Sequence, residues 1–268
     1  MLSNRIYFKN FKKKKTDSKI KNYLNKIISD KNQVINSFSK SYKNSYKKSD
    51  ILKFKKFRNI ILIGMGGSSL GARCIYNFLG HKIKKKITFI DNLDEKIKIK
   101  SNKKTLNLII SKSGNTLETI VNSNLLIKKN HKNIFITEKK NSYLMNLAIK
   151  LKSEIIHHNN FIGGRYSVLS EVGMLPAELM GLEPKKFRTL NEIIKNKRFI
   201  NSLVLNVSSK LDLINKKKFN SIILNYDEKS NELFSWYQQL IAESLGKKSK
   251  GLYPIISTMP KDNHSLMQ

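Results

Sequence analysis

Apolar and polar residues follow one another along this chain in blocks typical of strands that alternate with helices. Short apolar runs predict strands at residues 59–63, 87–90, 106–110, 133–137 and 154–157. Apolar residues at helical spacing predict helices at residues 70–79, 117–129 and 143–151. This alternation favours a parallel sheet. We therefore expect an α/β fold, a three-layer sandwich of a parallel sheet with flanking helices.

The two ends of the chain have a different pattern. Residues 1–50 are polar and lysine-rich, and apolar positions from Ile20 to Ile28 have helical spacing, which predicts an N-terminal helical segment before a first domain at 51–197. A partial second domain is expected at 198–268. Its predicted helices and strands lie at residues 202–214, 221–226, 232–245 and 252–256. Because two strands are few for a sheet, we expect a truncated protein whose second domain is incomplete.

The large net charge of the chain changes the expected function little. The 268 residues hold 52 Lys and Arg against 19 Asp and Glu, a net charge of +33, and clusters such as Lys12–Lys15 and Lys82–Lys86 could bind a polyanion. The excess is lysine spread along the whole chain, however, and lysine lacks the planar fork that reads phosphates and bases specifically. We interpret the charge as a solvated surface that steers small anions, with no specific nucleic-acid partner.

Other compositional features narrow the class of protein. The longest apolar runs are the size of a strand, far below the roughly 20 residues of a membrane span, and the N-terminus lacks the apolar centre of a signal peptide. The single cysteine, Cys74, excludes an internal disulfide and fits a cytoplasmic protein. We expect Cys74 to be a packing residue. We expect the neighbouring pair His157 and His158 to be structural, because no Cys or further His stands at metal-binding spacing from it.

Two small-residue loops each follow a predicted strand and precede a predicted helix. The first holds Gly66, Gly67 and Ser68. It fits a phosphate site at a helix N-terminus or a tight structural turn equally well. The second, Ser111–Thr116, offers three hydroxyls at a strand end, which favours phosphate binding, although the same residues could simply cap the next helix. Lys112 would either neutralise the anion or remain solvated.

Three further residues are candidates for the chemistry itself. Arg165 directly follows the backbone of Gly164, so a fixed positive charge stands beside a position open to close approach. Glu243 lies near the end of a predicted helix, where mild desolvation would raise its pKa toward that of a general base, but surface charge is the plain alternative. His264 follows Asp262, a carboxylate that could tune it.

Taken in order, these motifs resemble those of the glucose-6-phosphate isomerase family. The resemblance rests on five segments across residues 60–268: Gly64–Ser68, Ser111–Thr119, Gly163–Ser167, Ala242–Lys247 and Asp262–Ser265. It implies two sugar isomerase (SIS) domains, an active site between them completed in a homodimer, and no metal or organic cofactor. The implied substrates are glucose 6-phosphate and fructose 6-phosphate, interconverted in glycolysis and gluconeogenesis.

The resemblance also implies roles for single residues. The sugar phosphate would be held by loop residues of the first domain, namely Ser68, Ser111, Ser113 and Thr116 with Lys112, Gly66, Gly67 and Gly164. Arg165 would stabilise an enediolate, Glu243 would move the proton between C2 and C1, and His264 would assist ring opening from the neighbouring subunit. These roles agree with what aldose–ketose exchange requires, namely one base, a cation near the developing oxyanion and a remote anchor.

Two departures from the family pattern, and two rival functions, stay open at this point. Asn263 stands where the family has Gln, and the C-terminal region that carries a ring-opening lysine in the family is absent, so we expect this chain to turn over poorly. One rival is an isomerase of the same fold that also accepts mannose 6-phosphate. The other is a non-catalytic sugar-phosphate sensor that binds nucleic acid, which would need neither Glu243 nor Arg165.

Overall fold

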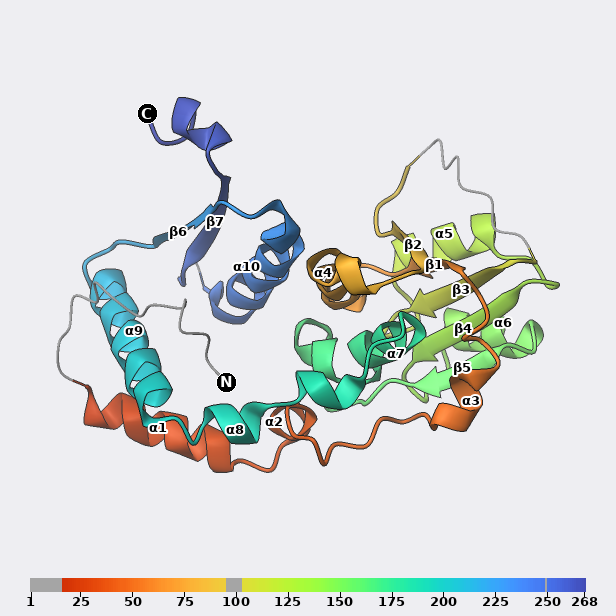
Figure 1. Cartoon of the computed structure of the whole chain (residues 1–268), viewed down its shortest axis with the longest axis horizontal. Coiled ribbons are helices and arrows are strands. Elements are labelled where there is room, and N and C mark those ends of the chain that lie inside the picture. The colour runs from red at the N-terminus through yellow and green to blue at the C-terminus, as the bar shows by residue number, and fades with distance from the viewer. Residues whose placement is uncertain (1–15, 95–102, 249) are drawn as a thin grey trace.

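Two parallel sheets, of five and two strands, organise the computed structural model, which describes residues 16–94, 103–248 and 250–268 (Figure 1). The basic run Lys12–Lys15 lies outside these residues. The larger sheet has the order β2-β1-β3-β4-β5. Its strands are β1 (Asn59–Ile63), β2 (Lys86–Ile90), β3 (Thr105–Ile110), β4 (Lys132–Thr137) and β5 (Glu154–His157). All five predicted strands are confirmed.

Helices cover both faces of this sheet. Alternate residues of each strand point to opposite sides, so each strand contributes side chains to a core on either face. Leu106, Leu108 and Ile110 of β3 pack into one core with α3 (Lys48–Leu52), α4 (Leu70–Phe78) and α7 (Glu171–Leu179). Ile109 packs into the other core with α5 (Leu117–Leu126) and α6 (Tyr143–Lys150). The predicted three-layer sandwich is therefore confirmed. Helix α5 is three residues shorter than predicted, since Ile127 is already extended.

Helix α7 is an element that the sequence pattern did not predict. All nine of its residues are buried, so it has no polar face and no helical alternation of apolar and polar positions. Its burial includes Glu171, whose carboxylate accepts hydrogen bonds from the Asn159 backbone at 2.6 Å and from the Tyr42 hydroxyl at 3.3 Å. These partners satisfy a charge that would otherwise be costly inside the protein.

The N-terminal segment forms α1 (Ser18–Ser29) and α2 (Gln33–Ser37), which confirms the predicted leading helix. Helix α1 packs along α9 (Lys197–Asn215), and the short α8 (Leu190–Ile193) lies beside them (Figure 1). Tyr46, which precedes α3, is buried in the core of the five-stranded sheet. The division of the chain at residues 50 and 197 stays a prediction.

The second sheet pairs β6 (Asn220–Asn225) with β7 (Tyr253–Thr258), joined through α10 (Asn231–Leu245). These elements, and α9, confirm the predicted order, although α9 begins five residues early because Asn196 caps the Phe199 backbone N–H at 3.0 Å. Helix α10 lies between β7 and α4 (Figure 1). Arg73 of α4 joins the two units through ion pairs with Asp91 and, at 3.4 Å, with Glu232. Among the described helices, none is both long and apolar enough to cross a membrane.

Candidate active site

The two small-residue loops meet at the carboxyl edge of the five-stranded sheet. Strands β1 and β3 are neighbours in the sheet, so the loops that follow them, Gly64–Ser69 and Ser111–Thr116, begin side by side. A Cβ at Gly64 would lie 2.9 Å from the Ile110 carbonyl oxygen, so only glycine allows this approach without displacement. Helices α4 and α5 begin directly after these loops, and their N-termini favour an anion.

Hydroxyls gather in the second loop. Ser111 and Thr116 hydroxyls lie 2.9 Å apart, and the Gly114 backbone N–H donates to Ser111 Oγ at 3.1 Å. Ser113 Oγ accepts from the Asn115 backbone N–H at 3.1 Å. Thr116 occupies the N-cap position of α5, but its side chain does not bond the helix backbone. The structure therefore does not support the alternative interpretation, in which the Thr116 hydroxyl caps helix α5.

Lys112 has its amine directed away from these hydroxyls. Its Nζ donates to the Asn160 carbonyl at 3.0 Å and lies 3.5 Å from Glu138. The backbone of Lys112 is thus part of the loop, but its charged amine contacts Asn160 and Glu138 instead of the loop hydroxyls. Binding of the phosphate by this amine stays a prediction.

The first loop is also pressed against the segment that carries Arg165. A Cβ at Gly67 would lie 2.3 Å from the carbonyl carbon of Gly164, so the two backbones are in direct contact. Ser167 Oγ donates to the Gly164 carbonyl at 2.6 Å and lies 3.4 Å from the Gly67 carbonyl. Both loops form short 3-10 turns, Gly66–Ser68 and Gly164–Leu169. Because Gly164 directly precedes Arg165, this close approach fixes the position of the Arg165 backbone.

Arg165 and Glu243 form an ion pair although 78 positions separate them in the chain. Arg165 Nη1 lies 2.8 Å from Glu243 Oε1, and Arg165 Nε donates to Ser244 Oγ at 2.8 Å. The guanidinium also stands 4.6 Å from the centre of the Tyr166 ring. Trp236 of α10 donates its indole N–H to the Arg165 carbonyl at 2.9 Å. Side chain and backbone of Arg165 are therefore both held by α10.

A pair of hydroxyls supports this arrangement. Tyr166 OH and Ser244 Oγ lie 2.8 Å apart, so Ser244 contacts both the arginine and the tyrosine. The hydrogen bond with Ser244, together with the nearby Arg165 guanidinium, lowers the pKa of Tyr166. Tyr166 was no candidate in the sequence because a Tyr after an Arg has no distinguishing spacing.

The expected desolvation of Glu243 is wrong for this structure. Its side chain is 47% exposed, because it lies in the last turn of α10, a helix in which no residue is fully buried. Its environment is set by the Arg165 guanidinium rather than by an apolar enclosure. Exposed ion pairs of this kind contribute little to stability, about 0–1 kcal/mol, so this pair adds little to the free energy of folding.

Gln239 belongs to the same group and was not a sequence candidate. Its Nε2 donates to Glu243 Oε2 at 3.3 Å, and a Cβ at Gly66 would lie 2.8 Å from that nitrogen. Gln239 Oε1 is buried and has no hydrogen-bond partner among the described residues. A spacing of four residues on one helix puts Gln239 and Glu243 on the same face, and this signal could have identified it.

His264 is not brought to this group. It ends the short turn Lys261–His264 after β7 and is exposed, beyond the second sheet at the C-terminal end of the chain (Figure 1). The Asp262 carboxylate accepts from Ser257 Oγ at 3.0 Å and from the Thr258 backbone N–H at 2.7 Å. Asp262 therefore anchors this turn to β7, and a role of His264 stays a prediction.

The remaining candidates take structural positions. Burial, with a contribution from Glu232, raises the pKa of Cys74 to about 11, which leaves the thiol unreactive near neutral pH. His158 is buried and its Nδ1 pairs with the Asn159 carbonyl at 2.9 Å. Within the part of the chain that the structure describes, no three His, Cys, Asp or Glu side chains cluster closely enough to hold a metal ion.

Similarity to known proteins agrees with this arrangement. The model of the phosphoglucose isomerase family matches residues 9–255. A glucose-6-phosphate isomerase of Methanocaldococcus jannaschii is 35% identical over 235 residues, which is 79% of this chain and 56% of the relative. One of Mycoplasmopsis synoviae is 32% identical and is covered to 55%. The chain thus spans about half the length of the curated relatives it matches.

Solved structures support the fold. A hypothetical protein of Thermus thermophilus aligns over 94% of this chain and 66% of its own, with a TM-score of 0.72 at 22% identity. A tagatose-6-phosphate ketose/aldose isomerase of Escherichia coli aligns over 81% of this chain and 60% of its own, with a TM-score of 0.54 at 14% identity. With the family model matching most of its residues, this chain belongs to the phosphoglucose isomerase family.

Proposed function

We propose that the protein containing this chain is an aldose–ketose isomerase that interconverts D-glucose 6-phosphate and D-fructose 6-phosphate. The observation that carries the proposal is the Arg165–Glu243 pair, 2.8 Å apart, beside the close contact of Gly67 with Gly164. A base next to a fixed cation is what proton transfer through an enediolate requires. The printed names of the relatives, glucose-6-phosphate isomerases, support the same substrate.

The phosphate of the sugar would bind at the two loops at the carboxyl edge of β1 and β3. Ser68, Ser111, Ser113 and Thr116 bring hydroxyls to this edge, and two helices begin there. The Ser111–Thr116 hydroxyl pair would exchange its mutual hydrogen bond for bonds to phosphoryl oxygens. Binding energy gained far from the reacting carbons then orients them for reaction.

Glu243 would take the proton from C2 of the open-chain sugar and return it to C1. Arg165 would stabilise the negative charge that develops on the enediolate oxygen. Because the guanidinium is also held by Ser244 and by the Tyr166 ring, it needs little rearrangement during the reaction.

The setting of this activity is part of the proposal. We infer a cytoplasmic homodimer without a metal or organic cofactor, acting in glycolysis and gluconeogenesis. The exposed position of His264 supports its action in the active site of a neighbouring subunit, where it would assist ring opening. The exposed turn would reach that site once two copies associate.

The test is conversion of fructose 6-phosphate to glucose 6-phosphate, with mannose 6-phosphate formation measured in parallel. Both the 268-residue chain and a chain extended through the sequence encoded downstream are assayed, because the relatives are longer. We expect Glu243→Gln to lower kcat by about 10²–10⁴-fold in the active form, the usual contribution of a general base.

The matched control is Glu228→Gln, which removes an exposed carboxylate close to the start of the same helix. This control should keep full activity. Absence of isomerisation in both chain lengths would overturn the proposal, and so would equal activity of the Glu243 and Glu228 variants.

A further inference from the structure

The segment that carries Arg165 runs between strand β5 and helix α7. It extends from Asn159 to Glu171, the first residue of α7, and includes the 3-10 turn Gly164–Leu169. Its own backbone-to-backbone hydrogen bonds join residues three positions apart. Such local bonds shape a turn but do not attach it to the rest of the protein. Contacts from other parts of the chain must therefore fix where the turn lies.

Arg188 holds the far end of this turn. Its Nε and Nη2 atoms both donate to the Leu169 carbonyl, at 3.1 and 2.7 Å, and Leu169 is the last residue of the turn. Nη1 donates to the Tyr42 carbonyl at 3.1 Å, and Nη2 donates to Asn44 Oδ1 at 2.6 Å. Two N–H groups of one planar guanidinium on a single oxygen fix its direction as well as its distance, which a lysine amine cannot do.

The position of Arg188 is itself fixed by its surroundings. The residue is 3% exposed, and its guanidinium stands 4.8 Å from the centre of the Tyr42 ring. The Tyr42 hydroxyl donates to the Glu171 carboxylate at 3.3 Å, and the Asn159 backbone N–H donates to the same carboxylate at 2.6 Å. Burial and the nearby Glu171 raise the pKa of Tyr42 to about 12, so this hydroxyl keeps its proton and stays a donor. Both ends of the segment, Asn159 and Leu169, are thus tied to Tyr42 through buried charged side chains.

The Arg188 guanidinium fixes a position more than it adds stability. Removing a charge from water has a cost in free energy, and apolar side chains of similar volume often stabilise a protein as well. What the guanidinium provides is a defined place for the Leu169 carbonyl, four residues after Arg165. Trp236 and Ser244 of α10 hold Arg165 from the other side. A cation that stabilises a developing charge acts best when its position is set in advance.

We propose that Arg188 is a positioning residue for Arg165. By fixing the Leu169 end of the turn, it sets where the Arg165 guanidinium meets the Glu243 carboxylate, and its effect on catalysis rests on the proposed isomerase function. Among the described residues its hydrogen-bond partners are Leu169, Tyr42 and Asn44, which lie outside the two loops proposed to bind phosphate. Loss of the guanidinium should therefore slow the reaction without weakening substrate binding.

The experiment measures kcat and KM for fructose 6-phosphate in the chain length that isomerises. Arg188→Lys keeps the charge but loses the planar fork, so it should lower kcat about tenfold and change KM less than twofold. In an Arg165→Ala background the same substitution should lower kcat less than twofold further, because the residue that it positions is gone. A merely structural role would give equal losses in the two backgrounds, and that result would overturn the proposal.

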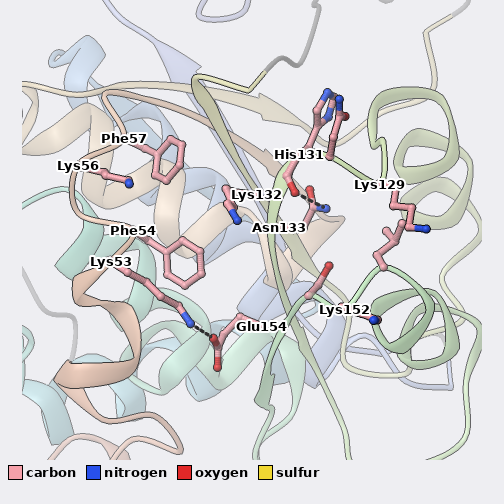
Figure 2. Close-up of a pocket in the computed structure, with 13 residues that line it drawn as sticks. Lys53, Phe54, Lys56, Phe57, Lys129, His131, Lys132, Asn133, Lys152 and Glu154 are labelled. Atoms are coloured by element: carbon pink, nitrogen blue, oxygen red, sulfur yellow. Dashed lines mark hydrogen bonds and ion pairs between the residues drawn. The ribbon is translucent and has the colours of Figure 1, made fainter.

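Two control variants separate this role from a general loosening of the protein. Arg198→Lys makes the same substitution at an exposed position. Lys53→Gln breaks the 2.7 Å ion pair of Lys53 with Glu154, which joins the segment after α3 to the start of β5, at the opposite edge of the sheet (Figure 2). Both controls should keep kcat within twofold. A loss in Lys53→Gln equal to that in Arg188→Lys would contradict the proposal.

A milder variant covers the case in which Arg188→Lys does not fold. Asn44→Ala removes one acceptor of the guanidinium and leaves Arg188 in place. It should lower kcat about threefold at an unchanged melting temperature. An unchanged kcat in this variant would count against the proposal as fully as an unchanged kcat in Arg188→Lys.

Hydrogen exchange tests the tie without the reaction. In Arg188→Lys or, if that variant does not fold, in Asn44→Ala, the backbone amides of residues 159–171 should exchange at least threefold faster. The amides of β4, which Arg188 does not contact, should exchange at the same rate. Unchanged exchange in residues 159–171 would overturn the proposal. Absence of isomerisation in every chain length would overturn the proposed function, and the exchange rates would still decide whether Arg188 holds the turn.

Discussion

The five-stranded and the two-stranded sheet share parallel strands and apolar runs, yet they are buried very differently. All six residues of β3 are buried, and so are all nine of α7. In the second sheet, Ile222 and Leu224 of β6 are about half exposed, at 50% and 46%, and α10 has no buried residue. The stability of the chain therefore resides mainly in the first sheet, where apolar side chains leave water completely.

This difference matters for the chemistry, because the candidate active site draws on both regions. Arg165 lies between β5 and α7 in the region of the five-stranded sheet, whereas Glu243 and Gln239 lie on the less buried α10. The contacts of Arg73 with Asp91 and Glu232 connect the two. The better-packed region thus provides Arg165 and the two small-residue loops, and the other places Glu243 against Arg165.

The largest expected effect is on the stability of the first region. Leu108→Ala in β3 removes a side chain that is fully buried in the core, so it should lower the free energy of unfolding by about 2–5 kcal/mol. Urea denaturation followed by circular dichroism measures this loss. A change below about 1 kcal/mol would contradict the view that this sheet carries most of the stability.

A smaller effect is expected where the loops meet. Gly67→Ala would place a Cβ 2.3 Å from the Gly164 carbonyl carbon, and the resulting shift should cost about 1–3 kcal/mol and weaken fructose 6-phosphate binding. Thermal unfolding and a calorimetric titration measure the two consequences. Gly80→Ala is the control, since no atom lies within 4 Å of its added Cβ. If both variants behaved alike, the close contact would have no energetic importance.

The smallest effect is expected in the second region. Ile222→Ala truncates a side chain that is half exposed on β6, so the free energy of unfolding should change by no more than about 0.5 kcal/mol. The same urea titration used for Leu108→Ala gives a direct comparison. A loss of about 2 kcal/mol or more would mean that this face of β6 is covered in solution.

Much of the fold could be predicted because most strands and helices here have local sequence signals. Runs such as Leu106–Ile110 are apolar throughout, since both faces of the strand are covered, and the glycine loops mark where strands end. Helix α7 escaped prediction because uniform burial erases the alternation on which such predictions depend. The prediction that Glu243 is desolvated was wrong, because the sequence does not show how deeply the end of a helix is buried.

The sequence by itself determined the order of the strands and of the helices that have an amphipathic pattern, the small-residue loops between them and the motifs of the family, because these depend on neighbours along the chain. Only the tertiary structure decided that Arg165 pairs with Glu243 and that Gln239 joins them with an unsatisfied oxygen. Such arrangements depend on which backbones can approach closely, as Gly67 and Gly164 do. Packing between segments far apart in the chain sets these distances, and no local pattern encodes them.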